Sequence, residues 1–357
     1  MSAIGKERIR KVFDATGAGA LFINDPHNIG YISGFMGEGM LYISRSRNVL
    51  ITDSRYTEAA AAASDFEILE EKNSHRRIDI LRECIAADGI DIVGYEDNYM
   101  TCSEFSRFEN ALEEVQQWLP LENQINAIRR IKTPQELEYL ARAEAVGDAA
   151  FADILQILKP GMTELDVAAE LEYRMKKHGA QGLSFDTIIA SGVNSSKPHA
   201  VPGSKVLEKG DFVTMDFGCL IEGYCSDMTR TVVLGKADDR QREIYQTVLK
   251  AQTEALAVLK AGMKGSEVDA VARGIIRDAG YGDCFGHGLG HSVGLYIHED
   301  PRLSPTDDTV LEADMIETVE PGIYVPGFGG VRIEDMVVVT ADGCRNLAHS
   351  PKELIEL

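Results

Sequence analysis

A repeat in the second half of the chain restricts its fold more than any other feature. The segment Leu158-Lys159-Pro160-Gly161-Met162 recurs as Leu259-Lys260-Ala261-Gly262-Met263. Each copy opens a helical pattern, which ends near Gly179 in the first copy and near Gly280 in the second. Chance would explain a shared helix entry but not the matching length and final glycine. The sequence therefore predicts two copies of one structural unit.

Each copy is followed by two strand-like stretches, and each stretch carries one carboxylate among apolar residues. The stretches are 211–217 with Asp216, 225–233 with Asp227, 315–324 with Glu320, and 331–339 with Glu334. We expect one hairpin in each half. Opposed positions on antiparallel strands hold their Cβ atoms about 4.5–5.5 Å apart, which suits two carboxylates that share a metal ion. Buried carboxylates need cations, so the pattern predicts a metal site.

His291 ends the glycine-rich run 286–291 and adds a nitrogen ligand to these four carboxylates. Five ligands exceed what one ion in a small site usually takes from a protein, which predicts two divalent ions. Such pairs activate water for attack on a carbonyl or phosphoryl centre. The oxygen-rich ligands favour Mn²⁺, with Co²⁺ or Zn²⁺ as alternatives. Solvated surface carboxylates would explain each residue singly, but not the set with its apolar neighbours.

The amino-acid composition disfavours some classes of binding partner. The 57 acidic and 36 basic side chains give a net charge of -21, which disfavours nucleic acid and anionic membranes as partners. No apolar run approaches the ~20 residues of a membrane-spanning helix. The six cysteines form no CxxC pair, and residues 1–13 have the pattern of a charged amphipathic helix rather than a secretion signal. We expect a cytoplasmic protein.

At 357 residues the chain is long enough for two domains. Up to residue 126, strand-like runs (20–23, 41–43, 49–51, 92–95) are interspersed with helical patterns (6–15, 56–63, 76–87, 103–115). A new helix is signalled by Thr133-Pro134-Gln135-Glu136, which combines an N-cap, a first-turn proline and a capping box. We predict an N-terminal α/β domain over 1–126 and a second domain over 127–357.

Four runs in the second domain resemble those of the creatinase/aminopeptidase, or pita-bread, metallopeptidases. They are Gly-His-Gly-Leu-Gly-His at 286–291, His-Glu-Asp-Pro at 298–301, Glu-Pro-Gly-Ile-Tyr at 320–324 and Gly-Val-Arg-Ile-Glu-Asp at 330–335. The most similar branch is that of Xaa-Pro dipeptidase (prolidase) and Xaa-Pro aminopeptidase. The N-terminal runs 25–31 and 52–56 resemble the same branch more weakly. Creatinase itself lacks the metal ligands, so the intact five argue against it. The resemblance implies an α+β fold, with a duplicated pita-bread catalytic domain behind a smaller α/β domain.

The resemblance also implies roles for the five ligands. Asp216 would hold one ion, His291 and Glu320 the other, and Asp227 and Glu334 would bridge both. Glu320 would also help to deprotonate the water that attacks the scissile carbonyl.

Further residues match active-site positions of the family. His199 and His298 would contact the substrate and stabilise the tetrahedral intermediate, and His287 and Tyr324 would contact the substrate. Arg332 lies two residues before Glu334, so strand alternation would place it beside the carboxylates. As a catalytic residue it would there orient the carboxylate cluster or contact the substrate. By the same rule Thr229 accompanies Asp227, where its hydroxyl could bond a ligand.

The resemblance predicts cleavage of the bond between an N-terminal residue and proline in small peptides, by a homodimer. Proline lacks an amide hydrogen and fixes φ, so general peptidases fail on it. Arg302 matches a prolidase position that pairs with the substrate's terminal carboxylate, which favours dipeptides. The alternatives are an Xaa-Pro aminopeptidase acting on longer peptides, and a binding module without catalysis.

Other features have simpler interpretations. We expect His27, His75, His178 and His349 to be surface or loop residues. The glycines of 286–294 lack the Lys-Ser/Thr ending of a phosphate loop, and we expect them to let backbone pass close to substrate.

Overall fold

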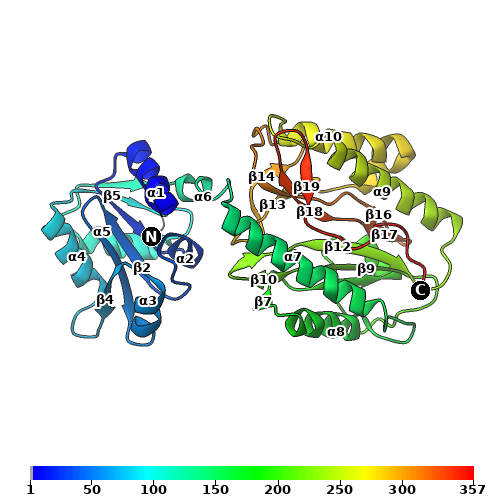
Figure 1. Ribbon diagram of the computed structural model, residues 1–357, viewed down its shortest axis with the longest axis horizontal. Helices are drawn as coiled ribbons and strands as arrows, with labels where there is room; N and C mark the ends of the chain where they lie inside the picture. Colours follow the sequence, from blue (N-terminus) through cyan, green and yellow to red (C-terminus); the bar gives the residue numbers. More distant parts are fainter. Residues whose placement is uncertain (1–2) are drawn as a thin grey trace. The chain divides into compact units, whose positions relative to one another are not determined.

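The N-terminal unit, residues 1–129, is built on a six-stranded mixed sheet with the strand order β4-β3-β2-β1-β5-β6 (Figure 1). The computed structural model describes residues 3–357, so Met1 and Ser2 of the predicted N-terminal helix lie outside the described residues. The strands are β1 Ala20–Ile23, β2 Met40–Ser44, β3 Asn48–Asp53, β4 Glu67–Glu71, β5 Ile92–Tyr95 and β6 Gln117–Pro120. The helices are α1 Ala3–Thr16, α2 Pro26–Ser33, α3 Thr57–Ala63, α4 Arg77–Asp88, α5 Cys102–Ala111 and α6 Gln124–Ala127.

Four elements of this unit were not predicted, namely α2, α6, β4 and β6. Helix α2 has clear local signals: Asp25 accepts a hydrogen bond from the His27 amide, Pro26 occupies the first turn, and Gly34 ends the helix with φ 85°. Strand β4 has the acidic sequence Glu-Ile-Leu-Glu-Glu, and no fully buried residue. Its pairing with β3 is a tertiary effect that the local pattern does not contain.

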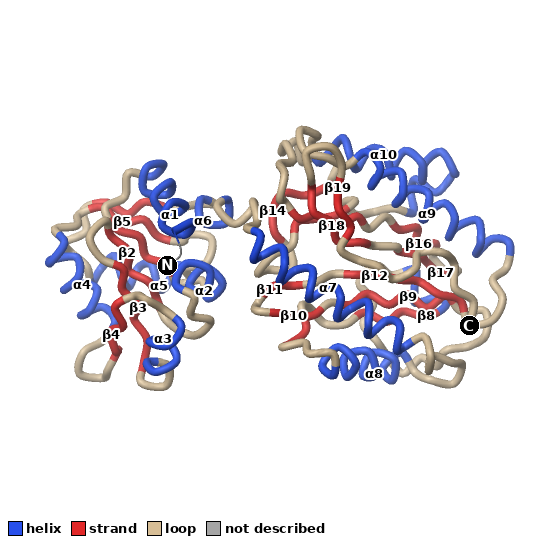
Figure 2. The backbone as a smooth tube through the Cα atoms, in the orientation of Figure 1, coloured by secondary structure: helices blue, strands red, loops and turns tan. Residues whose placement is uncertain are grey.

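The second unit, residues 130–357, contains two similar helix pairs. They are α7 Pro134–Ile154 with α8 Glu164–Lys177, and α9 Asp239–Val258 with α10 Gly265–Ile276. The first pair packs against β9 and β12 in one apolar core, and the second pair packs against β15 to β18 in another. Figure 2 shows the strands of both halves between these helices. The repeated segments end just before α8 and α10, as the repeat predicts.

The remaining elements of this unit are mostly short strands. In the first half they are β7 Gly182–Leu183, β8 Ile188–Ser191, the 3₁₀ turn η1 Gly192–Ser196, β9 Phe212–Phe217, β10 Cys219–Ile221, β11 Tyr224–Cys225 and β12 Met228–Val233. In the second half they are η2 Arg277–Tyr281, η3 Gly282–Cys284, β13 Gly290–Ser292, β14 Glu299–Leu303, β15 Ile316–Val319, β16 Gly322–Val325, β17 Gly329–Arg332, β18 Asp335–Val339 and β19 Cys344–Asn346. The α+β class with a duplicated C-terminal domain is confirmed.

The hairpins differ in detail from the predicted ones. Asp216 in β9 pairs with Thr229 rather than with Asp227, which lies just before β12. Glu320 follows β15 and Glu334 precedes β18, so three of the four carboxylates lie where strands are interrupted. A strict two-residue period does not reveal such interruptions.

The two halves are joined at the interrupted strands. The amide of Glu334 donates to the carbonyl of Thr229 at 3.1 Å, and the Thr231 hydroxyl donates to the carbonyl of Arg332 at 3.0 Å. The ligands of both halves are thereby brought to one place. Within residues 3–357, no helix has the length and apolar character needed to cross a bilayer.

Candidate metal centre

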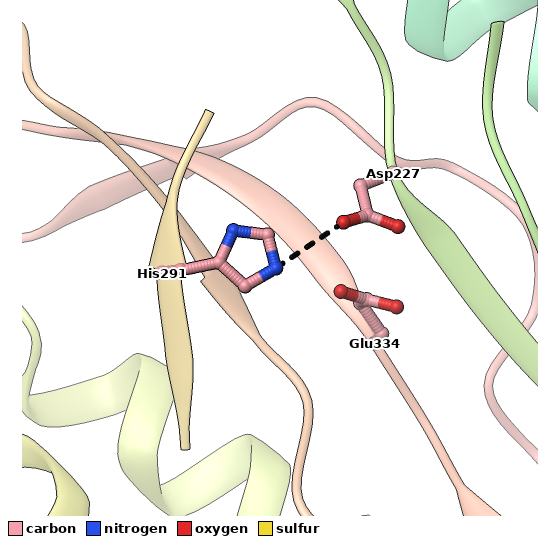
Figure 3. A group of neighbouring side chains, drawn as sticks. All are labelled: Asp227, His291 and Glu334. Carbon is pink, nitrogen blue, oxygen red and sulfur yellow. Dashed lines mark ion pairs between the residues drawn. The ribbon is translucent and has the colours of Figure 1, made fainter. Parts of the chain in front are cut away.

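All five predicted ligands line one cavity of about 430 Å³ in the second unit. His291 comes from β13, Asp227 precedes β12 and Glu334 precedes β18, and Figure 3 shows their side chains pointing toward one another. One ligand atom from each of these three residues lies within 4.8 Å of the others. All three side chains are buried. Three donors from segments far apart in sequence thus meet at a desolvated point.

His291 presents a lone pair to this point. Its Nδ1 lies 3.1 Å from the carbonyl of Ser292, which can only accept, so Nδ1 carries the proton of the neutral ring. Burial, together with the nearby His298, lowers the pKa of His291 to about 3. The unprotonated Nε2 then lies 3.4 Å from Asp227 Oδ2 and 3.4 Å from Glu320 Oε1. Acceptors face acceptors here, an arrangement that a bound cation stabilises.

The carboxylates repel one another in the same way. Burial, reinforced by Glu334, Asp216 and Glu320, raises the pKa of Asp227 well above its usual range. Burial and the charge of Glu320 do the same for the pKa of Glu334. For Glu320, burial raises the pKa to about 8 although Arg332 opposes it. A bound divalent cation would offset both the cost of burying these charges and their mutual repulsion, so this set of ligand atoms fits a metal.

Arg332 is the cation that the chain itself supplies. Its Nη2 donates to Asp216 Oδ2 at 2.6 Å, and its Nε donates to Thr229 Oγ1 at 3.0 Å. The other oxygen of Asp216, Oδ1, is buried and has no hydrogen-bond partner among the described residues. Arg332 thus pairs closely with only one of the four carboxylates that line the cavity. The orphaned Asp216 oxygen and this excess of carboxylates also fit a bound cation.

Two threonine hydroxyls orient the ligands. Thr229 Oγ1 donates to Glu334 Oε2 at 2.6 Å, so the ligand that Thr229 reaches belongs to the other half of the repeat. Thr318 Oγ1 accepts from the His291 amide at 3.1 Å and donates to Glu320 Oε1 at 3.3 Å. Thr318 was not predicted, although it lies two residues before Glu320, just as Arg332 lies two residues before Glu334.

A chain of hydrogen bonds leads from Arg332 to His287. Nδ1 of His287 donates to the carbonyl of Gly288, and burial lowers the pKa of the ring to about 4, so Nε2 is an acceptor. The hydroxyl of Tyr324 donates to this Nε2 at 2.9 Å and accepts from Arg332 Nη1 at 2.8 Å. His287 and Tyr324 therefore hold the guanidinium of Arg332 against Asp216.

His199, His298 and Arg302 line the same cavity. The His298 ring lies 4.5 Å from that of His291 between centroids. All the predicted site residues except Tyr324 line the cavity, and Tyr324 touches two that do. Six further lining residues were not predicted: Phe185, Asp186, Ile188, Pro198, Ile297 and Ser304.

The glycine-rich run owes part of its composition to packing. A Cβ on Gly290 would lie 1.9 Å from the carbonyl oxygen of Thr318, so β13 can approach β15 only with glycine at this position. The backbone that requires glycine at position 290 is therefore that of strand β15. Each remaining histidine lies beside a carboxylate: His27 beside Asp25, which is buried, His75 beside Glu83, His178 beside Asp153 and His349 beside Asp148.

Comparison with known proteins identifies the family of this fold and site. Residues 138–341 match the model of metallopeptidase family M24, and residues 6–131 match the creatinase/prolidase N-terminal domain. The chain belongs to metallopeptidase family M24. The predicted relationship to pita-bread metallopeptidases, and the prediction that the protein is a metallopeptidase, are confirmed.

Similar proteins carry both predicted specificities. An Xaa-Pro dipeptidase of Pyrococcus furiosus is 39% identical, with 98% of this chain and 99% of that protein covered. A solved Xaa-Pro dipeptidase from Bacillus anthracis has a TM-score of 0.95 at 43% identity, with 99% of each chain covered. An X-Pro aminopeptidase from Thermotoga maritima has a TM-score of 0.92 at 38% identity, with 97% of this chain and 100% of that chain covered.

Proposed function

We propose that this metallopeptidase holds two divalent ions and hydrolyses the bond between an N-terminal residue and proline, preferring Xaa-Pro dipeptides. The observation that carries the proposal is the meeting of four carboxylates and a neutral histidine nitrogen in one cavity. The five side chains are more ligands than one divalent ion in a small site usually takes from a protein, which favours two. Family membership favours catalysis over a binding module.

Asp216, Asp227, His291, Glu320 and Glu334 would hold the ions, with Asp227 and Glu334 shared between them. We propose Mn²⁺ because most of the ligands are carboxylates, with Co²⁺ or Zn²⁺ as alternatives. Bound divalent ions polarise a peptide carbonyl and make water acidic enough to attack it at neutral pH.

The chain's own residues supply orientation and proton transfer. Glu320 would take up the proton of the attacking water. His298 and His199, which line the cavity near the ligands, would donate to the oxygen that becomes negative as the carbonyl is attacked. Arg332 would orient Asp216 through its hydrogen bond to that carboxylate, and Tyr324 and His287 would in turn orient Arg332.

The preference for dipeptides rests on Arg302, which lines the same cavity and pairs with His291 across β13 and β14. Its guanidinium would bind the substrate's terminal carboxylate, which only a dipeptide places next to the proline ring. The alternative is an Xaa-Pro aminopeptidase, in which longer peptides extend past Arg302. By family resemblance we also propose a homodimer in the cytoplasm, acting on small peptides rather than on nucleic acid or membranes.

Relative rates on Ala-Pro and Ala-Pro-Ala-Ala test the dipeptide preference. We expect faster cleavage of Ala-Pro, because a charge-assisted pair with Arg302 contributes about 1.5–3 kcal/mol. Arg302→Ala should therefore slow Ala-Pro by about tenfold to a hundredfold and leave the longer peptide unchanged. Comparable turnover of both peptides by the wild-type enzyme would show that it is an aminopeptidase.

A further inference from the structure

The loop that brings His199 to the cavity is tied at its base by a carboxylate from another element. Glu164 is the first residue of α8, and it is only 1% exposed. Its Oε1 accepts hydrogen bonds from the amide of Ser191 at 2.8 Å and from the Ser191 hydroxyl at 2.9 Å. Its Oε2 accepts from the amide of Gly203 at 3.2 Å. Since Ser191 and Gly203 flank His199 in sequence, one buried carboxylate joins both ends of the loop.

This carboxylate is not needed to cap its own helix. The Thr163 hydroxyl accepts from the amide of Asp166, and the Asp166 carboxylate accepts from the amide of Thr163 at 2.8 Å. That reciprocal pair is the capping box of α8. Glu164 instead directs both oxygens at the loop, and Asn194 Nδ2 adds contacts at 3.2 and 3.3 Å to them. A helix N-terminus favours the negative charge that these donors require.

The loop is held from the cavity side as well. The Ser195 hydroxyl in η1 accepts from the amide of Gly330 in β17 at 2.8 Å. Nη1 of Arg332 donates to the carbonyl of Pro198 at 3.4 Å, directly before His199. The loop is thus fixed between Glu164 at its base and the active-site strand at its tip, and His199 lies between these two points.

The internal repeat provides a comparison within the same molecule. In both halves the first amide of the second helix donates to the segment that follows: Glu164 N to Lys205 O at 3.0 Å, and Gly265 N to Thr309 O at 3.2 Å. Gly265 thus occupies the place of Glu164 in the other half. A Cβ there would lie 2.1 Å from the carbonyl oxygen of Arg302, so that half has no room for a side chain. The buried carboxylate is specific to the half that carries His199.

We propose that Glu164 is a positioning residue for peptide hydrolysis, which closes the base of the 191–203 loop and so fixes His199 at the cavity. The proposal rests on the proposed function, in which His199 contacts the substrate. Replacing Glu164 by glutamine keeps the size of the side chain but leaves one acceptor oxygen, and the amide group that replaces the other cannot accept from Gly203. The base of the loop should then open.

Amide hydrogen exchange tests the closure of the loop independently of activity. In Glu164→Gln we expect peptides that span 190–206 to exchange about tenfold faster or more, because hydrogen bonds to a charged acceptor are lost. Asp166→Asn alters the same helix terminus without touching the loop, and should leave this exchange at the wild-type rate. A wild-type rate of amide exchange in these peptides of Glu164→Gln would overturn the proposal, regardless of which peptides the enzyme cleaves.

A double-mutant cycle on Ala-Pro tests the route through His199. We expect kcat/KM to fall about tenfold in Glu164→Gln and about a hundredfold in His199→Ala. The double variant should be no slower than His199→Ala, because the misplaced group is already absent. Losses that multiply would overturn the proposal, since a merely structural defect persists without His199. Asn194→Ala, at a partly exposed residue, replaces Glu164→Gln in both experiments if that variant does not fold.

If the wild-type enzyme cleaves no Xaa-Pro peptide, the proposed function fails but the exchange experiment still decides whether Glu164 closes the loop. Manganese binding by Glu164→Gln should match that of the wild type, because no metal ligand lies in the loop. A loss of metal binding in this variant would assign its defect to the metal centre and overturn the proposal.

Discussion

Asp227→Asn will lower peptidase activity by about a thousandfold or more while leaving the protein folded. Asp227 is 5% exposed, and its Oδ2 lies 3.4 Å from Nε2 of His291. The amide cannot serve as an anionic ligand shared by two ions, and metal catalysis contributes several kcal/mol to the rate. Turnover of Ala-Pro in excess Mn²⁺ measures the loss. Asp153→Asn, which makes the same change at a surface site paired with His178, should retain full activity.

The metal-free form of this variant gives an independent test. Asp227 is repelled by Glu334, Asp216 and Glu320, so removing its charge should leave the metal-free protein as stable as the wild type or more stable. Added Mn²⁺ should raise the free energy of unfolding of the wild type by about 2.7 kcal/mol at a hundredfold excess over Kd, and its unfolding temperature should rise accordingly. The variant should gain less. Wild-type turnover in Asp227→Asn would refute the shared-ligand role.

Arg332→Met will have the opposite effect on the metal-free protein. The side chain of Arg332 is 4% exposed and pairs with Asp216 at 2.6 Å. Removing one partner of a buried ion pair costs about 3–5 kcal/mol. Glu320 and Glu334 also lose a cation whose charge opposes the rise of their pKa values. We expect the metal-free variant to unfold at a markedly lower temperature than the wild type.

Activity should fall with Arg332 as well, by about a hundredfold or more, because Asp216 and Tyr324 lose the donor that orients them. Arg332→Lys separates charge from geometry. Lysine should recover part of the stability but little of the activity, since it cannot donate to Asp216, Thr229 and Tyr324 at once. Full activity in the lysine variant would show that only the charge matters.

The local sequence contains much of this fold because the chain repeats itself. The two repeated segments locate α8 and α10, and Thr133-Pro134 locates the start of α7. Helix α9 was not predicted, although Asp238 and Gln241 form its capping box and apolar residues follow at helical spacing. Because α9 precedes the second repeated segment as α7 precedes the first, the repeat extended to this helix predicts α9.

The contacts that orient the ligands are the part that sequence patterns do not contain. Thr229 reaches Glu334 across 105 residues, and Arg332 reaches Asp216 across 116. Alternation within a strand predicts which side chains share a face, but not which strand of the other half faces them. The strand interruptions beside Asp227, Glu320 and Glu334 shift the register as well. The candidate ligands could thus be proposed one by one from the sequence, whereas their hydrogen-bond partners are visible only in the structure.

Titration of metal-stripped wild-type protein with Mn²⁺, with bound metal and Ala-Pro cleavage followed together, tests the central claim most directly. The arrangement of five ligands predicts two equivalents bound per chain, no cleavage without metal, and full activity only when both are bound. Cleavage by the metal-free chain, or saturation of binding at a single equivalent, would contradict the two-metal peptidase.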